Sequence, residues 1–461
     1  MSTKRWSIPF VLVILVSMLL AGCGPAPTPE VIKETVEVPV QETVVVEQTV
    51  VVEATAEPAA EAVEIEFWHS WAPDGVQGRV LQRLFNEFNA SQNEVFVTPI
   101  FVGEQRREKI TAALAAGEPP DVAWIAGAGS AYYDAGQYVS MSRVWEVLDR
   151  SDFYPALLEN MQFLGEDIAI PFENSNLAMY YNKDMLDAEG VEYPPGEVGG
   201  WTFPEFIEMA KIFSDAEQGK YGWDPLLDWD IQVHLFWAAG GEMFSPDFKT
   251  NLLCADTPEG DKQRELMAEA LGYWIDMLFV SKITSTDVGD QGFVSEDMPF
   301  VISGPWAMPR YLEANPNLNI GVASLPAHPE TRQVASYWYQ KALALFKTTE
   351  EREEATLKFI KWFYSPEIHA RWCAEASYLP ITISAAEHPV WQEFVAEHPY
   401  AQVFLDQAPT MKRRPIGIPI GSLGGGMLHP VIYDGATPEE AIENYCLDAQ
   451  ALLDEFWAMR P

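Results

Sequence analysis

Residues 63–125 alternate between strand-like and helix-like segments, and this order constrains the fold more than any other feature of the sequence. Val63, Ile65 and Phe67 alternate with glutamates, which is typical of a half-buried strand. Alternation and the recurrence of apolar residues every four positions predict strands at 63–67, 95–102 and 121–125, and helices at 76–88 and 104–116. A β-α-β-α-β order predicts a largely parallel sheet covered by helices.

A second α/β region follows Pro171. It is expected to contain strands at 178–181, 299–302, 320–325 and 337–346 and a helix at 350–363. Three pairs have the spacing of helix-capping residues: Asp74 with Gln77, Thr202 with Glu205, and Thr437 with Glu440. Two separate α/β regions in a chain of 461 residues predict a protein of two lobes.

The N-terminal residues have the pattern of a bacterial export signal. Lys4 and Arg5 precede an apolar run at 8–21, which is shorter than the about 20 residues that a membrane span needs. The run ends in small residues before Cys23, which resembles a lipobox and implies cleavage before Cys23 and lipidation of its sulfur. A plain secretory signal with a chance cysteine is the alternative.

Residues 24–63 are predicted to be a disordered tether. This segment repeats Val/Glu/Thr units between Pro-rich ends and contains no aromatic residue, so it has little with which to build a core. The valines have some β-propensity, and a transient strand is the competing interpretation.

The net charge limits the possible partners. The chain has 29 Lys+Arg and 68 Asp+Glu, a formal net charge of −39. So acidic a surface repels phosphate backbones, and nucleic acid is excluded as a partner. Neutral and cationic ligands stay open.

The cysteines indicate neither a metal site nor a redox motif. Cys254, Cys373 and Cys446 form no CxxC or zinc-binding spacing, and no metal or other cofactor is expected. Cys446 shares a helical stripe with Leu453 and is expected to be a buried thiol. A Cys254–Cys373 disulfide stays open.

Several short motifs occur in a familiar order along residues 64–461. They are found at 66–71, 117–122, 180–185, 201–206, 303–307, 321–326, 378–380 and 437–441. Together they resemble the family 1 extracellular solute-binding proteins, which include maltose- and glycerol-3-phosphate-binding proteins. The resemblance implies an α/β, two-lobed periplasmic-binding-protein type II fold with a hinge between the lobes.

The resemblance also implies the division of the chain. Lobe one would hold residues 64–169 and 327–348, and lobe two would hold 170–326 and 349–461. The crossings would fall near 169–171, 325–327 and 347–348. A monomeric, lipid-anchored receptor would carry a carbohydrate in its cleft to the transmembrane subunits of an ABC permease.

The 16 tryptophans suit a sugar site, because sugars have flat apolar faces that stack on indole rings. The candidate ligand-binding tryptophans are Trp68, Trp71, Trp124, Trp229, Trp306 and Trp338. For Trp306 the stacking role is implied by the resemblance, and for the others a core position is the alternative. Four tryptophans on helical stripes are expected in the core instead: Trp201, Trp237, Trp274 and Trp362.

Polar candidates accompany these rings. They are Ser70, Glu104, Asp121, Glu173, Asn174, Asp228 and Gly304. The resemblance implies that Asp121 accepts sugar hydroxyls, and a local capping role is its alternative. Glu173 and Asn174 follow the first expected crossing, so they are predicted to face the cleft, with a solvated turn as the alternative.

The ligand is predicted to be a neutral oligosaccharide. A phosphate ligand needs basic side chains, and Arg413 and Arg414 are the nearest candidates in the sequence. Glycerol-3-phosphate or a glycerophosphodiester is the second expectation. A secreted glycoside hydrolase and a structural adhesin are alternatives from other classes, but no catalytic motif is present and no enzyme activity is expected.

Overall fold

The computed structural model describes residues 62–460 except 127–128, 225–228 and 413–425. The side chains of residues 126, 229–232 and 340 also lie outside the description. Every described residue belongs to one compact unit of the chain. The predicted signal, the Cys23 lipidation site and the tether up to residue 61 therefore lie outside the described residues.

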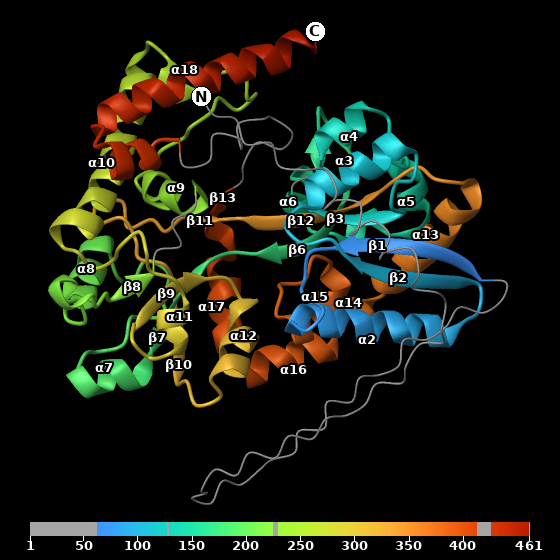
Figure 1. The fold of residues 1–461 in the computed structure, drawn as a ribbon, viewed down its shortest axis with the longest axis horizontal. Helices are drawn as coiled ribbons and strands as arrows, with labels where there is room; N and C mark the ends of the chain where they lie inside the picture. The colour runs from blue at the N-terminus through green and yellow to red at the C-terminus, as the bar shows by residue number, and fades with distance from the viewer. Residues whose placement is uncertain (1–61, 127–128, 225–228, 413–425, 461) are drawn as a thin grey trace, which may run out of the picture. The chain divides into compact units, whose positions relative to one another are not determined.

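A five-stranded sheet, here called the first sheet, has the order β2-β1-β3-β12-β6 (Figure 1). Its strands are β1 (Val63–His69), β2 (Val95–Phe101), β3 (Val122–Ala126), β6 (Ile170–Ser175) and β12 (Tyr339–Leu345). β1 pairs in parallel with both β2 and β3, as the strand–helix alternation predicts. β12 runs antiparallel to β3 and β6, so the sheet is mixed.

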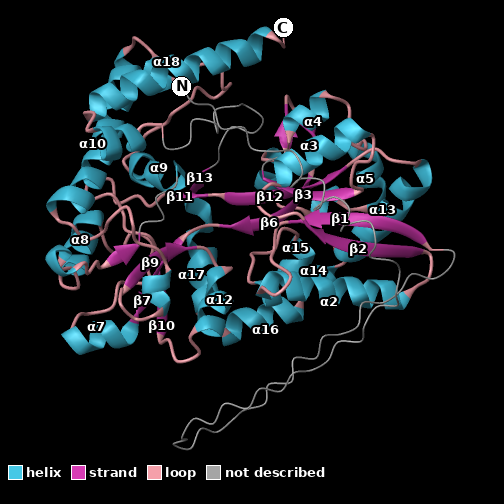
Figure 2. Cartoon of the chain, in the orientation of Figure 1, coloured by secondary structure: helices cyan, strands magenta, loops and turns pink. Residues whose placement is uncertain are grey.

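Helices cover both faces of the first sheet (Figure 2). Those near it are α2 (Val76–Ser91), α3 (Arg106–Ala116), α4 (Ser130–Asp134), α5 (Met141–Val147), α6 (Pro155–Glu159), α13 (Glu350–Phe363), α14 (Pro366–Ala376), α15 (Ile383–Glu387) and α16 (Pro389–Glu397). The apolar stripe of α2 is buried, as predicted. Gly117 ends α3 with φ 78°, a left-handed conformation that glycine adopts without steric cost.

The predicted Asp74–Gln77 capping pair is wrong. Gly75 is the N-cap of α2, and no side chain caps that helix. Gln77 instead donates hydrogen bonds from Nε2 to the carbonyl oxygens of Trp306 at 3.3 Å and Ala376 at 3.2 Å. The Gln77 side-chain amide therefore binds carbonyl oxygens from distant parts of the chain and does not form the helix cap that the local spacing predicts.

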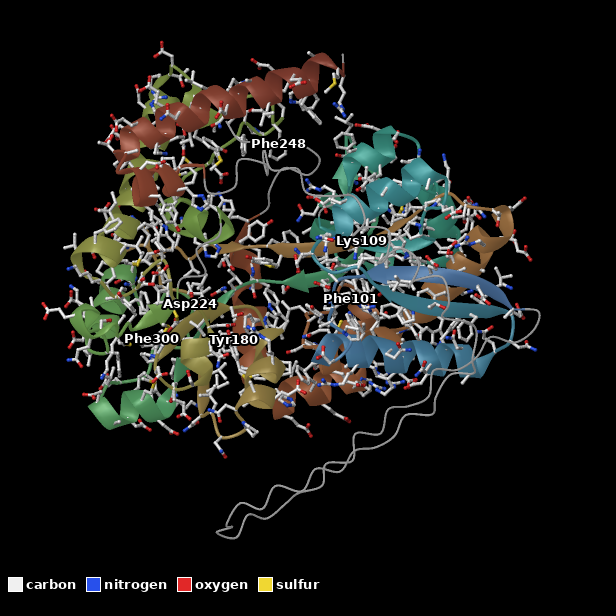
Figure 3. The ribbon with its side chains drawn as sticks, in the orientation of Figure 1. Phe101, Lys109, Tyr180, Asp224, Phe248 and Phe300 are labelled. Atoms are coloured by element: carbon white, nitrogen blue, oxygen red, sulfur yellow. The ribbon has the colours of Figure 1, made fainter. Side chains whose placement is uncertain are left out.

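A four-stranded sheet, here called the second sheet, has the order β10-β7-β9-β8. Its strands are β7 (Ala178–Asn182), β8 (Trp223–Asp224), β9 (Phe300–Ser303) and β10 (Ile320–Ala323). Tyr180, Asp224 and Phe300 mark this sheet in Figure 3, and Phe101 marks the first sheet. Two further pairs of short strands are β4 (Gln162–Phe163) with β5 (Glu166–Asp167), and β11 (Ser336–Tyr337) with β13 (Met411–Lys412).

The remaining helices lie mainly with the second sheet. They are α7 (Lys183–Glu189), α8 (Phe203–Lys211), α9 (Trp229–Ala238), α10 (Pro258–Ile275), α11 (Gln291–Val294), α12 (Ala307–Ala314), α17 (Tyr400–Gln407) and α18 (Pro438–Ala458). The capping boxes of Thr202 with Glu205 and Thr437 with Glu440 are both formed, as predicted. Trp201, Trp237 and Trp274 are buried in the core around this sheet, also as predicted.

The packing differs from the expected division into lobes. α13 contacts β1 and β2, and α14 contacts α2, so residues 350–376 belong with the first sheet and not with lobe two. Aromatic packing explains this, because Phe359 lies edge-on to Phe85 with ring centroids 5.0 Å apart.

The connections between the sheets also differ from the expected crossings. β6 is a strand of the first sheet, so the chain passes to β7 at residues 176–177 rather than near 169–171. Ala327 still pairs with Thr202 beside the second sheet, and the chain returns to the first sheet only at β12.

α18 extends from the second sheet toward elements of the first. Its N-terminal half contacts α10. Near its C-terminal end, Phe456 lies 5.9 Å from the Phe163 ring, and Arg460 forms an ion pair with Asp134 of α4. Among the described helices, none combines the length and apolarity needed to cross a membrane.

Candidate functional site

An aromatic group gathers where the chain leaves β1. Trp71 follows this strand, and its ring centroid lies 5.3 Å from that of Trp124 in β3 and 5.3 Å from that of Trp372 in α14. Tyr378, just beyond α14, stacks on Trp372 at 5.7 Å. Trp71 is half-buried and Trp372 fully buried, so the group passes from the core toward solvent.

The second sheet supplies the opposite part of this aromatic group. Trp306 follows β9, and its ring centroid lies 5.3 Å from that of Tyr339 in β12 and 6.5 Å from that of Tyr378. We call Trp71, Trp124, Trp306, Tyr339 and Tyr378 the aromatic cluster. It therefore contains side chains from elements of both sheets.

Gly304 allows the Trp306 ring to lie against the backbone. A Cβ atom at this position would meet the ring at 1.9 Å, which no side chain tolerates without moving the indole. The carbonyl oxygen of Gly304 accepts a hydrogen bond from the Tyr180 hydroxyl at 2.7 Å. The glycine thus fixes the orientation of an indole.

Three indole N–H groups around the aromatic cluster have polar partners. Trp124 Nε1 donates to Glu173 Oε1 at 2.6 Å, and Trp71 Nε1 donates to the Tyr378 hydroxyl at 3.1 Å. Trp338 Nε1 donates to Asn174 Oδ1 at 2.7 Å. These bonds orient the rings and bring Glu173 and Asn174 of β6 beside them.

Two cations lie over the rings. The Arg106 guanidinium carbon is 4.2 Å from the Trp124 ring centroid, and Arg106 also donates to Ser70 Oγ at 2.7 Å. Lys341 of β12 is the cross-strand partner of Glu173, with its Nζ 5.6 Å from the Trp124 centroid and 5.4 Å from that of Tyr339. Both geometries are typical of cation–π contacts.

Burial governs the ionisation of the charged groups. Desolvation raises the pKa of Glu173 to about 8, against the opposing effects of Lys341, the Trp124 hydrogen bond and Arg106. Desolvation also lowers the pKa of the Arg106 guanidinium, although neighbouring carboxylates oppose it. A Glu173 carboxyl that keeps its proton near neutral pH is able to donate a hydrogen bond as well as accept one.

Seven predicted site residues come together in and around the aromatic cluster: Ser70, Trp71, Trp124, Glu173, Asn174, Trp306 and Trp338, with Gly304 beneath Trp306. Flat apolar faces beside amide and carboxyl oxygens suit a hydroxyl-bearing organic solute, and the two cations add donors to this lining. Among the described residues, no group of His, Cys, Asp or Glu has the arrangement of a metal site.

Asp121 does not join this group. Its side chain is fully buried and accepts hydrogen bonds from the Glu66 backbone N–H at 2.8 Å and from Thr348 Oγ1 at 3.3 Å, and it pairs with Arg352. It lies before the first residue of β3, at the opposite end from the carboxyl terminus of that strand. The role is structural, but it differs from the expected local capping, because all three partners are distant in sequence, and both carboxylate oxygens already accept hydrogen bonds.

Trp68 and Glu104 also lie apart from the cluster. Phe67 and His69 of β1 point to the face that carries α2, so Trp68 points to the other face, where its Nε1 donates to Glu66 at 2.8 Å. Glu104 is exposed and acts on the site only through its charge near Arg106.

Some candidates fall outside the described residues. Asp228 lies in the undescribed segment 225–228, and Arg413 and Arg414 lie in 413–425. Only the backbone of Trp229 is described, at the start of α9.

Four residues of the site were not predicted from the sequence: Arg106, Lys341, Tyr339 and Tyr378. The alternation in β12 was a usable signal, because Tyr339 and Lys341 share a face with Leu343 and Leu345. No sequence pattern pointed to Arg106, because its position over Trp124 depends on how α3 packs against the first sheet.

The cysteines do not form the disulfide that was left open. Cys254, Cys373 and Cys446 are all free, and Cys373 is fully buried near His369. Cys446 is half-buried rather than buried.

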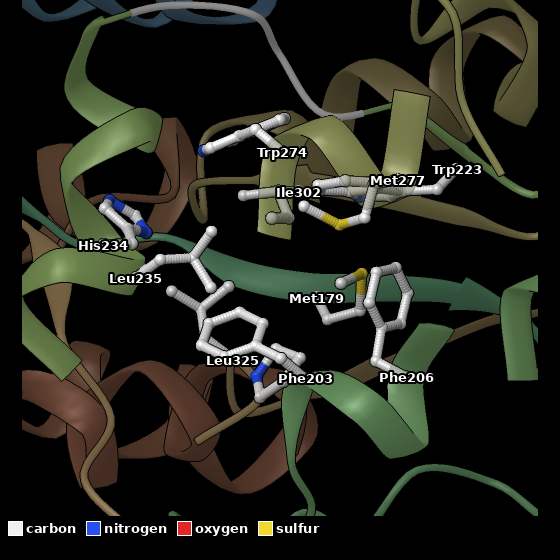
Figure 4. A pocket seen from close by; sticks show the side chains of 11 residues that line it. Met179, Phe203, Phe206, Trp223, His234, Leu235, Trp274, Met277, Ile302 and Leu325 are labelled. Atoms are coloured by element: carbon white, nitrogen blue, oxygen red, sulfur yellow. The ribbon is translucent and has the colours of Figure 1, made fainter. Parts of the chain in front are cut away.

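A small apolar cavity lies in the core beside the second sheet, away from the aromatic cluster (Figure 4). Met179 of β7, Ile302 of β9, Trp274 and His234 are among its lining residues. His234 is buried, and desolvation lowers its pKa to about 3, so it stays neutral. Such a lining offers few partners to a hydroxyl-rich ligand.

Comparison with known sequences identifies relatives along most of the chain. Residues 83–399 match the family described as bacterial extracellular solute-binding protein. A maltotriose-binding protein of Pyrococcus abyssi is 24% identical and is aligned over 87% of this chain and 83% of its own length. The sn-glycerol-3-phosphate-binding periplasmic protein UgpB of Yersinia pseudotuberculosis is 25% identical over 86% of this chain and 94% of its own.

Solved structures share the fold. The cyclic α-maltosyl-1,6-maltose binding protein of Arthrobacter globiformis superposes with a TM-score of 0.68 at 22% identity, over 86% of this chain and 100% of its own. UgpB of Mycobacterium tuberculosis, in complex with glycerophosphocholine, gives a TM-score of 0.72 at 21% identity over the same shares. The fold is the α/β periplasmic-binding-protein type II fold. Since the family match covers more than half of the sequence, the chain belongs to the bacterial extracellular solute-binding proteins.

Proposed function

We propose that this protein is the substrate-binding component of an ABC-type importer and that it binds a neutral oligosaccharide at the aromatic cluster. The observation that carries the proposal is the contact between Trp306, which follows a strand of the second sheet, and Tyr339 of the first sheet, next to the buried carboxyl of Glu173. The names of the relatives support a binding role.

A pyranose would stack its C–H face on Trp306 or Tyr339 and present its hydroxyl rim to polar groups. Glu173 and Asn174 would accept or donate hydrogen bonds at the rim, and Ser70 would contribute from the opposite side of Trp124. Such mixed lining is what distinguishes a carbohydrate site from an apolar core.

Ligand binding would be coupled to a hinge. Among the described residues, three connections join elements of the two sheets: one between β6 and β7, one from β10 through β11 to β12, and one between α16 and α17. Small φ/ψ changes in such connections are enough to rotate two rigid bodies. Closure would bring Trp306 and the residues of the first sheet onto opposite faces of one ligand, and a permease would then recognise the closed form.

We also propose that a diacylglycerol on Cys23 anchors the protein to the outer face of the cell membrane and that residues 24–63 act as a tether. The membership in an extracellular family supports an extracytoplasmic location. The receptor would act as a monomer, without cofactor and without chemical change to its ligand.

A thermal-shift panel tests the proposal. The full chain would be heated with neutral oligosaccharides, glycerol-3-phosphate and glycerophosphocholine, one at a time. A ligand at one hundred times its Kd should stabilise the native state by about 2.7 kcal/mol and raise Tm. The account predicts a shift with a neutral oligosaccharide that chromatography then recovers intact. No shift with any member, or cleaved sugar, would contradict it.

A second ligand class is favoured by one specific observation. Arg106 and Lys341 bring two cations to the Trp124 ring, and phosphate binding requires such groups. A glycerophosphodiester or glycerol-3-phosphate is therefore the second candidate. Stabilisation by phosphate compounds alone in the same panel would select it over the neutral oligosaccharide.

A further inference from the structure

A row of side-chain contacts fastens α18 to residues 243–254. The Tyr445 hydroxyl donates to Met243 Sδ at 3.2 Å, and Gln450 Oε1 accepts from the Asn251 N–H at 3.0 Å. Trp457 Nε1 donates to the Phe248 carbonyl at 2.9 Å. We call this row the α18 seam. Phe248, labelled in Figure 3, lies beneath α18.

Two cysteines face each other in the middle of the α18 seam. Cys254 ends the 3-10 turn η3 (Leu252–Cys254), and Cys446 lies in α18. Cys254 Sγ donates to the Cys446 carbonyl oxygen at 3.4 Å, which brings the Cys254 thiol against the residue that carries the second thiol. Both residues are half-buried, so a reagent is able to reach them.

Arg264 of α10 holds this part of the seam and supplies positive charge. Its guanidinium donates from NH1 to the carbonyl oxygens of Leu253 and Ala255, both at 2.9 Å. Interaction with the Cys254 thiol lowers the pKa of the Cys446 thiol, and the charge of Arg264 acts in the same direction, whereas the same interaction raises the pKa of the Cys254 thiol. A nearby guanidinium favours the thiolate, which is the nucleophile in disulfide exchange.

The third described cysteine has the opposite environment. Cys373 is fully buried, and desolvation raises its pKa well above the ordinary value. Its nearest polar neighbour, His369 Nε2 at 3.6 Å, is buried as well. Cys373 is thus an internal control for a thiol that does not react.

We propose that Cys254 and Cys446 form a disulfide that fastens α18 to η3 in the oxidised protein. The inference rests on the juxtaposition of two half-buried thiols beside Arg264 and is independent of the ligand. Extracellular proteins occupy the compartment in which disulfides persist.

The reaction requires a disulfide oxidant, either a thiol–disulfide oxidoreductase or a small-molecule disulfide. One of the two thiolates attacks a sulfur of the oxidant, forms a mixed disulfide and releases one thiol of the oxidant. The other cysteine, as its thiolate, then attacks the mixed disulfide at the protein sulfur. The intramolecular bond forms, the second thiol of the oxidant leaves, and the two protein thiols are oxidised while the oxidant is reduced.

The bridge would restrict the unfolded chain strongly. It would join positions that are 192 residues apart, and the stabilisation by a disulfide grows with the length of the loop that it closes. It would hold α18 where this helix continues toward Asp134 of α4.

Peptide mapping tests the proposal. The full chain, as a Cys23→Ser/Cys373→Ser variant, would be equilibrated with oxidised glutathione, unfolded in an alkylating reagent and digested without reductant. The expected result is one cross-linked pair of peptides containing Cys254 and Cys446, lighter by two hydrogens than the free peptides. The oxidised form should melt several degrees above the reduced form, and adding Cys446→Ser should abolish both results.

Complete alkylation of both cysteines after oxidation would overturn the proposal, as would a bridge only between two molecules. The chain with all its native cysteines provides a second measurement that does not depend on the variants folding. Its oxidised and reduced forms should differ in melting temperature, and cross-linking of Cys373 in place of Cys254 would also contradict the assignment.

Discussion

The aromatic cluster and the core beside the second sheet are both built on tryptophan, but they differ in what surrounds the indole N–H. Trp71 and Trp124 donate to Tyr378 and Glu173. In the core, Trp223 and Trp274 stack at 5.6 Å, and their Nε1 atoms have no partner among the described residues.

This difference separates two uses of the same side chain. A core indole contributes mainly the apolar area that it buries, and a missing hydrogen bond lowers that contribution. An indole whose N–H is engaged and whose face lies under a cation has a fixed orientation and a polar neighbourhood. Because the core Trp201 also donates from Nε1, to the Ser324 carbonyl oxygen at 2.9 Å, the cations over Trp124 distinguish the candidate site from this core better than engaged N–H groups do.

The largest expected effect is on stability, in the core. Trp274→Ala removes a side chain that is 1% exposed and should lower the free energy of unfolding by about 3–5 kcal/mol. Ligand affinity of the folded protein should be unchanged. Urea unfolding measures this, with the half-buried Trp362→Ala as the matched control. If Trp274→Ala lowers the free energy of unfolding no more than Trp362→Ala does, the assignment of Trp274 to a stabilising core would be wrong.

The next effect is on binding, in the cluster. Trp306→Ala should weaken the affinity by about 2–4 kcal/mol if the ring is a central anchor. Because Trp306 is half-buried, its loss should destabilise the fold less than Trp274→Ala does. Calorimetric titration of this variant and of Trp362→Ala gives the comparison, and equal affinities in the two variants would place the ligand elsewhere.

The Arg106→Gln variant tests whether the ligand is a neutral oligosaccharide or a phosphate compound. Removing one partner of a buried ion pair, here a guanidinium and a phosphate, typically costs about 3–5 kcal/mol, whereas a hydrogen bond between a charged group and a hydroxyl is worth about 1.5–3 kcal/mol. We expect the smaller loss, because the proposed ligand is a neutral oligosaccharide. Titration with the ligand selected by the thermal panel measures it, and a loss at the upper end would favour the phosphate class.

The raised pKa of Glu173 predicts that the free energy of unfolding depends on pH. Burial raises its pKa from 4.5 to about 8, so between these values the native state holds a proton that the unfolded state has released. Stability from this group is therefore complete below about pH 4.5 and falls as pH rises toward 8, by at most about 1.4 kcal/mol per unit. Glu173→Gln should flatten the decline in unfolding titrations. An unchanged slope would show that Glu173 is ionised throughout.

The smallest effect is expected at Trp68, on the other face of the first sheet. Trp68→Phe keeps a ring in place and removes only the hydrogen bond to Glu66, so it should cost about 0.5–1 kcal/mol of stability. Its affinity should equal that of the unsubstituted protein. Weaker ligand binding by Trp68→Phe, measured by calorimetry, would mean that Trp68 belongs to the binding site although it lies on the other face of the first sheet.

Local patterns were sufficient to predict most elements. Alternation at Val63, Ile65 and Phe67 gave β1, and the Thr202 and Thr437 capping boxes gave the starts of α8 and α18. The Asp74 prediction was wrong because the chain offered Gln77 two distant carbonyl oxygens instead. Local rules hold where no long-range partner competes.

The site was only partly predictable for the same reason. Glu173 was predicted from a crossing expected near 169–171, although it lies within β6, and Trp306 was predicted from a motif that follows β9; the structure brings both to one region. Asp121 lies in an equally clear motif, but Arg352, 231 residues further on, pairs with its carboxylate. Which carboxylate stays available depends on tertiary pairing, and one sequence does not show that pairing.

The most direct test is a crystal structure of the protein with the ligand that the thermal panel selects. The account predicts a ligand ring in contact with Trp306 or Tyr339 and within hydrogen-bond distance of Glu173. A ligand bound beside Trp68 on the other face of the first sheet, or one enclosed by Trp274 and His234, would contradict it.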